Sequence, residues 1–199
     1  MTNRTIFAIL LTLCLSVSAS ASEATDQTHD ELRALRDDIV DAVNKGDVDR
    51  LLTHLSPNVV VTFENAEVAR GRDGVRAYYD KMTKGPDALV ASYQTSVNVD
   101  ELTILYGDNT GVAFGSANDR FTLSSGVGLD VASRWTATLV REDGKWYVAA
   151  FHASANMFDN PILHKMKNTA YIAGIFGLVM GLVVGVGLMV AFGRRREKA

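Results

Sequence analysis

The sequence predicts an α+β fold in which helices cover one face of a curved, mostly antiparallel sheet. Apolar residues recur at helical spacing over the first part of the chain, whereas residues 89–157 alternate in the manner of β-strands. Turn motifs rich in Gly, Asn and Asp separate these strand segments, which is typical of an antiparallel meander. Helices followed by a run of strands favour an α+β domain.

Residues with capping chemistry define the first two helices. Thr28 and Glu31 form a capping box ahead of an apolar helical repeat, which Gly46 ends. Asp47 is expected to cap a short second helix that ends before Pro57.

A short strand and a third helix precede the remaining strands. Val59–Phe63 is a β-branched run, and Asp73 is expected to cap a helix that closes before Pro86. Four longer strand segments follow: Tyr93–Leu105, Thr110–Leu123, Val131–Arg141 and Trp146–Met157.

Charge is distributed unevenly along the 199 residues. The net charge is −3, but the region from Glu23 to Asn168 carries 22 acidic and 15 basic residues, while residues 193–199 have a net charge of +3. A domain that binds nucleic acid needs a basic face, so the acidic region argues against that partner. The single cysteine, Cys14, lies in the N-terminal apolar run, which leaves the mature domain without a disulfide.

Residues 1–21 have the composition of a cleavable secretory signal peptide. Arg4 is followed by the apolar stretch Ile6–Val17, and Ala19 and Ala21 supply small residues before the cleavage point. The apolar stretch is shorter than the ~20 residues that span a bilayer. A folded domain is expected over residues 22–160.

The C-terminal region predicts a single transmembrane helix over residues 171–192, preceded by a linker at 161–170. These 22 residues contain no charge and no proline. The basic tail, residues 193–199, includes Arg194 and Arg196, and this charge bias places the C-terminus in the cytoplasm and the domain outside. Lack of disulfides and of glycosylation sequons after the signal fits a periplasmic domain in a bacterium.

Small residues recur every four positions along this helix, at Ala173, Gly177, Gly181 and Gly185. Such a stripe lets two helix backbones approach closely in lipid. We therefore expect a homodimer in the membrane.

Five motifs, in this order and spacing, resemble the nuclear transport factor 2-like superfamily, which includes SnoaL-like and ketosteroid-isomerase-like proteins. The motifs are residues 44–49, 69–75, 134–136, 141–146 and 152–154. The resemblance covers about residues 28–160. It implies a cone-shaped α+β barrel, often dimeric, with a pocket between the helices and the concave sheet. The fold hosts many activities, so it does not imply one function.

Steroid-isomerase chemistry is not expected from the residues present. That reaction needs a carboxylate base and an oxyanion site made by a tyrosine and an aspartic acid. The corresponding positions fall near Phe63, Ile39 and Thr136, and none of the three matches. Glu64 is one residue away from the base position, and a shift of one residue reverses the direction of a strand side chain.

His152 is the main candidate for acid–base chemistry, with Trp146 and Ser154 on the same strand face by period two. The alternative is a structural histidine inside the fold. Arg134 could bind a carboxylate or lie in solvent, and Tyr78 could line an apolar pocket or belong to the core.

Neither a metal nor a cofactor is expected, because no residues have metal-ligand spacing and no phosphate or dinucleotide motif is present.

Three functions stay open. The domain could be a non-catalytic ligand-binding or oligomerising module, an enzyme acting on a small apolar or polyketide-like molecule through His152, or an assembly partner of a membrane complex.

Overall fold

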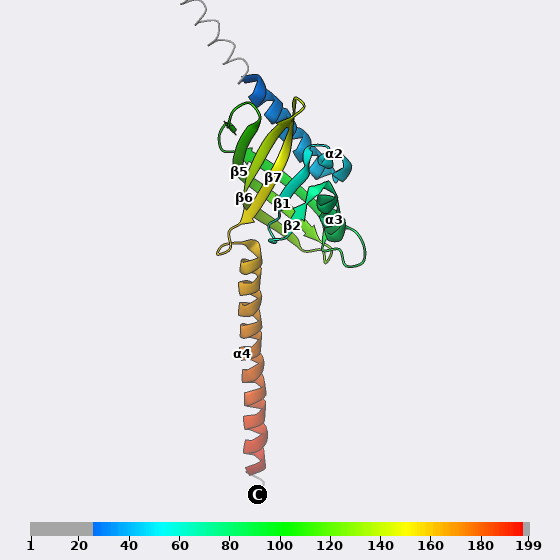
Figure 1. Cartoon of the computed structure of the whole chain (residues 1–199). Helices are drawn as coiled ribbons and strands as arrows, with labels where there is room; N and C mark the ends of the chain where they lie inside the picture. Colours follow the sequence, from blue (N-terminus) through cyan, green and yellow to red (C-terminus); the bar gives the residue numbers. More distant parts are fainter. Residues whose placement is uncertain (1–25, 197–199) are drawn as a thin grey trace, which may run out of the picture. The chain divides into compact units, whose positions relative to one another are not determined.

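The computed structural model describes residues 26–196, and their side chains as far as residue 189 (Figure 1). The chain forms two compact units, one ending at Ala155 and one beginning at Asn156. The predicted signal peptide, residues 1–21, lies outside the described residues.

The first two helices meet at a tight turn. The first covers residues 26–45 of the described chain, so the prediction that a capping box at Thr28 begins it is wrong. Gly46, with a φ of 67°, ends this helix. Asp47 caps α2 (Val48–Leu52), as predicted, because its side chain accepts a hydrogen bond of 3.0 Å from the Arg50 backbone N–H.

The third helix, α3, spans Gly71–Thr83 and begins two residues before the predicted cap. Arg70 is the N-cap and its side chain makes no capping bond, while Asp73 lies in the first turn. There the Asp73 carboxylate interacts favourably with the helix dipole rather than capping the helix. A short strand, β2 (Val68–Arg70), lies between the predicted strand Val59–Phe63 and α3, where no strand was predicted.

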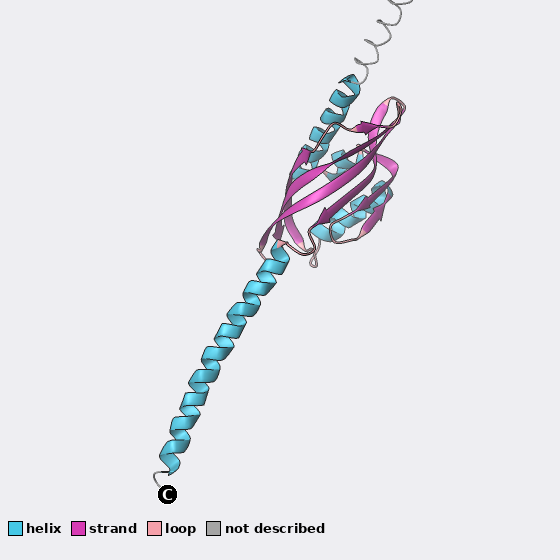
Figure 2. Cartoon of the chain, turned by 90° about the vertical axis from the view of Figure 1, so that its left-hand side faces the viewer, coloured by secondary structure: helices cyan, strands magenta, loops and turns pink. Residues whose placement is uncertain are grey.

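The sheet has seven strands, and six of them follow the order β2-β1-β7-β6-β5-β3. Figure 2 shows the strands, in magenta, as a curved and twisted sheet. The strands are β1 (Leu55–Thr62), β2, β3 (Val90–Val99), β4 (Ile104–Leu105), β5 (Thr110–Leu123), β6 (Gly128–Glu142) and β7 (Lys145–Ala155). Only β1 and β7 pair in parallel, and β4 pairs with β5. The curved α+β sheet is confirmed, but it stays open: β2 and β3 are its edges, so it does not close into the expected barrel.

One face of the sheet, the inner face, packs against the helices. Leu32 and Leu35 of the first helix, Leu52 of α2 and Val75 of α3 are buried in the same cluster as Trp135 on β6. Along β5 and β6, buried residues alternate with residues exposed on the opposite, outer face. The described helices of the first unit therefore leave the outer face uncovered.

A β-bulge in β7 breaks the period-two pattern of the last strand. Leu139 pairs with Val148, whereas the preceding residue of β6, Thr138, pairs with Ala150. Ala149 is the extra residue, and it moves every later side chain of β7 to the other face.

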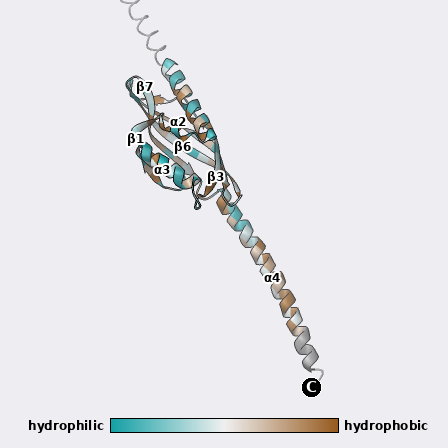
Figure 3. Cartoon of the chain, turned by 90° about the vertical axis from the view of Figure 1, so that its right-hand side faces the viewer, coloured by the Kyte–Doolittle hydropathy of each residue, from teal (hydrophilic) through white to brown (hydrophobic). Residues whose placement is uncertain are grey.

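The second unit contains α4, which runs from Pro161 to Arg196 without interruption (Figure 3). Its segment Pro161–Met189 is long and apolar enough to cross a membrane. The residues assigned to the linker, 161–170, belong to the same helix. Among the described residues, nothing lies within 4 Å of a Cβ built on Gly177 or Gly181, so this face is open. Self-association through it stays a prediction.

Candidate functional site

A buried carboxyl group lies among hydroxyl groups on the inner face of the sheet. Asp119 of β5 is 4% exposed and lies between β3 and β6. Tyr93 of β3 donates a hydrogen bond of 2.6 Å to its Oδ1, and Ser133 of β6 donates one of 2.5 Å to its Oδ2. Both oxygens of a buried carboxylate are thereby satisfied.

Glu64 places a second carboxyl group beside Asp119. β1 ends at Thr62, and a turn follows in which the Ala66 N–H donates to the Phe63 carbonyl at 2.9 Å. Burial and, after it, the negative charge of Asp119 raise the pKa of Glu64 to about 7, while the nearby Ser133 hydroxyl partly opposes them. Glu64 Oε1 is buried without a hydrogen-bond partner among the described residues.

Two pairs of aromatic rings include the neighbours of these carboxyl groups, Tyr78 and Tyr93. Phe63 and Tyr78 stack with ring centroids 3.5 Å apart, and Tyr93 packs against Phe121 at 4.7 Å. Burial, followed by the charges of Glu67 and Glu64, raises the pKa of Tyr78 to about 12. Burial and the charge of Asp119 also raise the pKa of Tyr93, so both phenols remain hydrogen-bond donors at neutral pH.

This arrangement is suited to proton transfer. Glu64, with its pKa raised to about 7 by burial and then by the charge of Asp119, exchanges its proton near neutral pH, and Asp119 beside it accepts two hydrogen bonds. A group with a pKa near the working pH can both accept and donate a proton. Perturbed carboxyl groups beside apolar rings are characteristic of functional sites, although structural networks also produce them.

The outer face holds three of the residues predicted for the site. His152, Arg134 and Ser154 are exposed, so the prediction that His152 and Ser154 share a face with Trp146 is wrong. The bulge at Ala149 accounts for this error. Arg134 forms an ion pair of 2.5 Å with Asp100.

The other two predicted residues lie on the inner side of the sheet. Trp146 is only 4% exposed and belongs to the hydrophobic core. Tyr78 is half-buried and lies close enough to Glu64 for the charge of Glu64 to affect its pKa. Of the predicted site residues, Tyr78 is thus the one that the fold brings to the carboxyl pair.

Sequence reasoning missed both carboxyl groups. Glu64 was treated as a strand residue facing away from the site, but the strand ends two residues before it. The position of Asp119 on the inner face could have been found from the sequence. It continues the every-second-residue pattern of the small buried residues Ala113, Gly115 and Ala117. An acidic residue on a buried strand face needs partners or a function.

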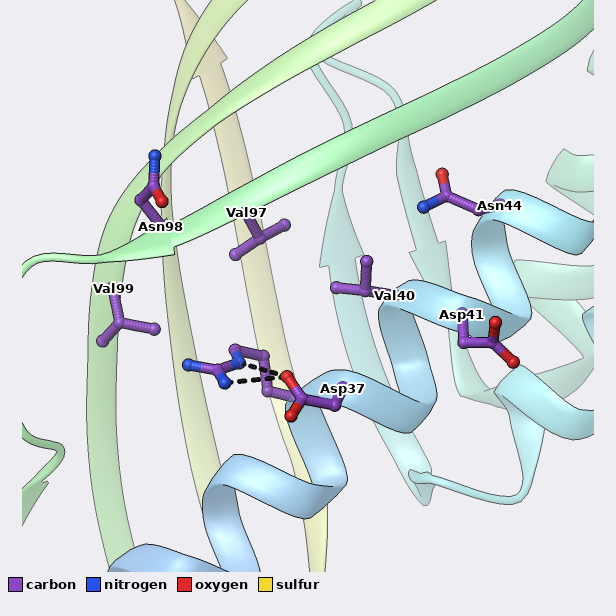
Figure 4. Close-up of a pocket in the computed structure, with 8 residues that line it drawn as sticks. Asp37, Val40, Asp41, Asn44, Val97, Asn98 and Val99 are labelled. Carbon is purple, nitrogen blue, oxygen red and sulfur yellow. Dashed lines mark hydrogen bonds and ion pairs between the residues drawn. The ribbon is translucent and has the colours of Figure 1, made fainter.

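A separate groove lies between the first helix and the edge strand β3, with a volume of about 580 Å³. Figure 4 shows Val40 and Val97 facing this space, with Asp37 ion-paired to Arg36 at 2.7 Å. Asn44 ends the groove by exchanging two hydrogen bonds, of 2.9 and 2.7 Å, with the Thr95 backbone. Its lining charges are paired, which makes it less suited to chemistry than the carboxyl pair.

No group of three or more His, Cys, Asp or Glu side chains within residues 26–196 could hold a metal ion.

Solved structures share this fold at low sequence identity. A hexachlorocyclohexane dehydrochlorinase from Novosphingobium barchaimii is 14% identical, with a TM-score of 0.59 over 68% of this chain and 90% of that one. A ketosteroid isomerase-like protein from Erwinia carotovora is 15% identical, with a TM-score of 0.53 over 62% and 92%. An NTF-2-like protein of unknown function from Shewanella oneidensis is 18% identical, with a TM-score of 0.50 over 63% and 97%. At these identities the likeness concerns the fold alone.

Sequence comparison gives the family. No curated protein matches the chain significantly. The family model of the SnoaL-like domain matches residues 37–149, which is more than half of the chain and includes Glu64, Tyr93, Asp119 and Ser133. The protein therefore belongs to the SnoaL-like domain family.

Proposed function

We propose that this protein is a membrane-anchored SnoaL-like enzyme that transfers a proton on a small organic molecule, with Glu64 as the acid–base group. The observation that carries the proposal is the buried carboxyl pair: Glu64 Oε1 has no hydrogen-bond partner among the described residues and lies beside the 4% exposed Asp119, in agreement with a pKa of Glu64 raised to about 7. Enzymes place carboxyl groups in such surroundings to perform acid–base chemistry at neutral pH.

Each neighbouring group has a role in the proposal. Burial and the charge of Asp119 keep Glu64 partly protonated, while Tyr93 and Ser133 fix the Asp119 carboxylate through hydrogen bonds. The stacked rings of Phe63 and Tyr78 offer an apolar surface to the substrate. A molecule with an acidic C–H bond and an apolar body fits these groups.

The cellular placement belongs to the same proposal. The charge-free helix anchors the chain, the basic tail lies in the cytoplasm, and the domain is exported behind a signal peptide. The site would then act on a molecule outside the cytoplasm.

The test uses the full-length chain in mild detergent and a nitrobenzisoxazole, whose ring opens when a base removes its C–H proton. Wild-type protein is expected to open the ring with a rate that rises as Glu64 deprotonates near pH 7. Glu64→Gln should lower the rate about 100-fold or more, because the glutamine side chain keeps the shape of glutamate but cannot accept the proton.

His152→Ala is the control, since His152 lies on the outer face and should not affect the rate. A rate that is unchanged in Glu64→Gln, or that falls in His152→Ala instead, would contradict the proposal. Binding without turnover, seen as quenching of Trp135 fluorescence by the probe at equal strength in both proteins, would favour a non-catalytic ligand-binding module.

A further inference from the structure

The first turns of α4 carry polar side chains along one side of the helix. The spacing i, i+3, i+4, i+7 brings four exposed residues together there, and we call them the polar face of α4: His164, Lys167, Asn168 and Tyr171. Ile162 and Met166 lie on the opposite side, so this part of the helix is amphipathic. The charge-free part that follows has no such polar side (Figure 3).

The place of the polar face along the helix puts it at the level of lipid headgroups. The charge-free segment begins at Tyr171, and ~20 residues from there cross the hydrocarbon layer of a bilayer. With a rise of about 1.5 Å per residue, Lys167 comes about 6 Å before that layer. The headgroup region on each side of the hydrocarbon is about 5 to 7 Å thick. Lys167 is therefore expected beside the phosphate groups.

Lys167 brings a positive charge to this level. Its side chain is exposed and has no ion-pair partner within the described part of the chain. Lys165 adds a second cation next to the polar face. His164 is already held by Asp159, at 2.6 Å, so the two lysines supply the charge that attracts an anion.

From this position and charge we propose that the polar face of α4 binds the phosphate group of an anionic phospholipid, on the side of the membrane that holds the domain. The Lys167 ammonium group pairs with the phosphate, and the Asn168 amide and the Tyr171 hydroxyl donate hydrogen bonds to it. This binding requires the membrane anchoring proposed above, but not the acid–base role of Glu64.

The charge of the folded domain makes the choice of lipid matter. The region from Glu23 to Asn168 carries 22 acidic and 15 basic residues, so an anionic bilayer repels it. Lysines at the phosphate level oppose this repulsion, because they attract anionic lipids over a distance of about one Debye length. A zwitterionic headgroup has no net charge and gains much less from the same lysines.

The test measures which lipid collects around the helix. Full-length protein is reconstituted into phosphatidylcholine vesicles, and electron spin resonance gives the association constants of spin-labelled phosphatidylglycerol and spin-labelled phosphatidylcholine. Every protein also carries Arg194→Gln, Arg195→Gln and Arg196→Gln, so that the basic tail does not mask the result. Carbonate extraction reports whether the chain is inserted, and circular dichroism checks the fold of each variant.

The parent chain is expected to prefer phosphatidylglycerol, and Lys165→Gln with Lys167→Gln should lower this preference about fivefold or more. Lys84→Gln with Lys145→Gln is the matched control, because it removes the same charge from exposed lysines of the first unit and should change nothing. An inserted parent chain without the preference, or a preference that survives Lys165→Gln with Lys167→Gln, would overturn the proposal. A chain that carbonate extracts would overturn the anchoring and this proposal together.

A second pair of changes tests the two hydrogen-bond donors without altering the charge. Asn168→Ala with Tyr171→Phe should lower the preference about twofold or more, because both donors to the phosphate are lost. Thr169→Ala is the control, since the Thr169 hydroxyl already donates to the Lys165 carbonyl at 2.9 Å. A preference that the first pair leaves unchanged would overturn the assignment of these donors.

Discussion

At the scale of single residues, Glu64 shows how a short turn can create a reactive group. The side chain leaves the strand direction just after β1 and comes to lie against Asp119, on a face lined by aromatic rings. Loss of water and a neighbouring negative charge both favour the protonated acid. The same two effects make the stability of the fold depend on pH.

Glu64→Gln tests this dependence. The pKa of Glu64 is raised in the folded state from 4.5 to about 7, so its contribution to stability is full below pH 4.5 and is lost as the pH rises through 7. The free energy of unfolding of the wild type should fall by about 1 to 2 kcal/mol over this range relative to Glu64→Gln, after allowance for partial exposure. Urea unfolding followed by the fluorescence of Trp135 and Trp146 measures this difference; parallel pH curves for the two proteins would refute it.

The sequence could predict some of these residues but not which side chains lie beside them. Tyr78 was expected either to line a pocket or to belong to the core, and it lies beside Glu64 while packing against the core. His152 was placed by counting along an ideal strand, and one extra residue, Ala149, invalidates that count. Bulges and strand ends depend on tertiary pairing, which local periodicity does not contain.

At the scale of elements, the close approach of β3 and β5 depends on Gly115. A Cβ built on Gly115 would lie 1.9 Å from the Asn98 carbonyl oxygen and 2.9 Å from Cζ2 of Trp135. Since the first contact is with backbone, the strands themselves would have to move apart. This glycine therefore sets the spacing of the strands that carry Tyr93 and Asp119.

Gly115→Ala should lower the free energy of unfolding by about 2 to 3 kcal/mol, the cost of overpacking a well-packed core. Gly128→Ala is the control, because a Cβ there meets nothing within 4 Å. Thermal unfolding of the two variants gives the comparison, and equal midpoints would show that the strands adapt freely.

Most elements were predictable because their signals are local. The strand Thr110–Leu123 has the predicted bounds, and Asp47 caps α2 as its side chain suggests. The short strand β2 was missed, and the predicted strand Tyr93–Leu105 is divided into β3 and β4, because pairing with β1 and β5 rather than composition defines β2 and β4. The barrel expected from the resemblance is an open sheet here, since β2 and β3 do not pair.

At the scale of the whole molecule, the chain joins a SnoaL-like domain to one helix that can span a membrane. The helix could be predicted from hydropathy alone, because a segment must be long and apolar to cross a bilayer. Whether the helix also pairs is a separate property, governed by its small residues.

Gly177→Ile with Gly181→Ile should abolish pairing of the isolated transmembrane segment in a bacterial two-hybrid assay, because the larger side chains separate the backbones. Leu178→Ile with Leu182→Ile changes neighbouring residues off the stripe and should have no effect. An unchanged signal in the glycine variant would remove the stripe as a contact.

The central claim is that Glu64, buried beside Asp119, exchanges its proton near neutral pH. Its most direct measurement is an NMR titration of the Glu64 carboxyl carbon in full-length protein labelled with ¹³C-glutamate, assigned with Glu64→Gln. The account predicts a midpoint near 7 in the wild type and a lower one in Asp119→Asn, where the neighbouring negative charge is absent. A wild-type midpoint near 4.5, unchanged in Asp119→Asn, would contradict it.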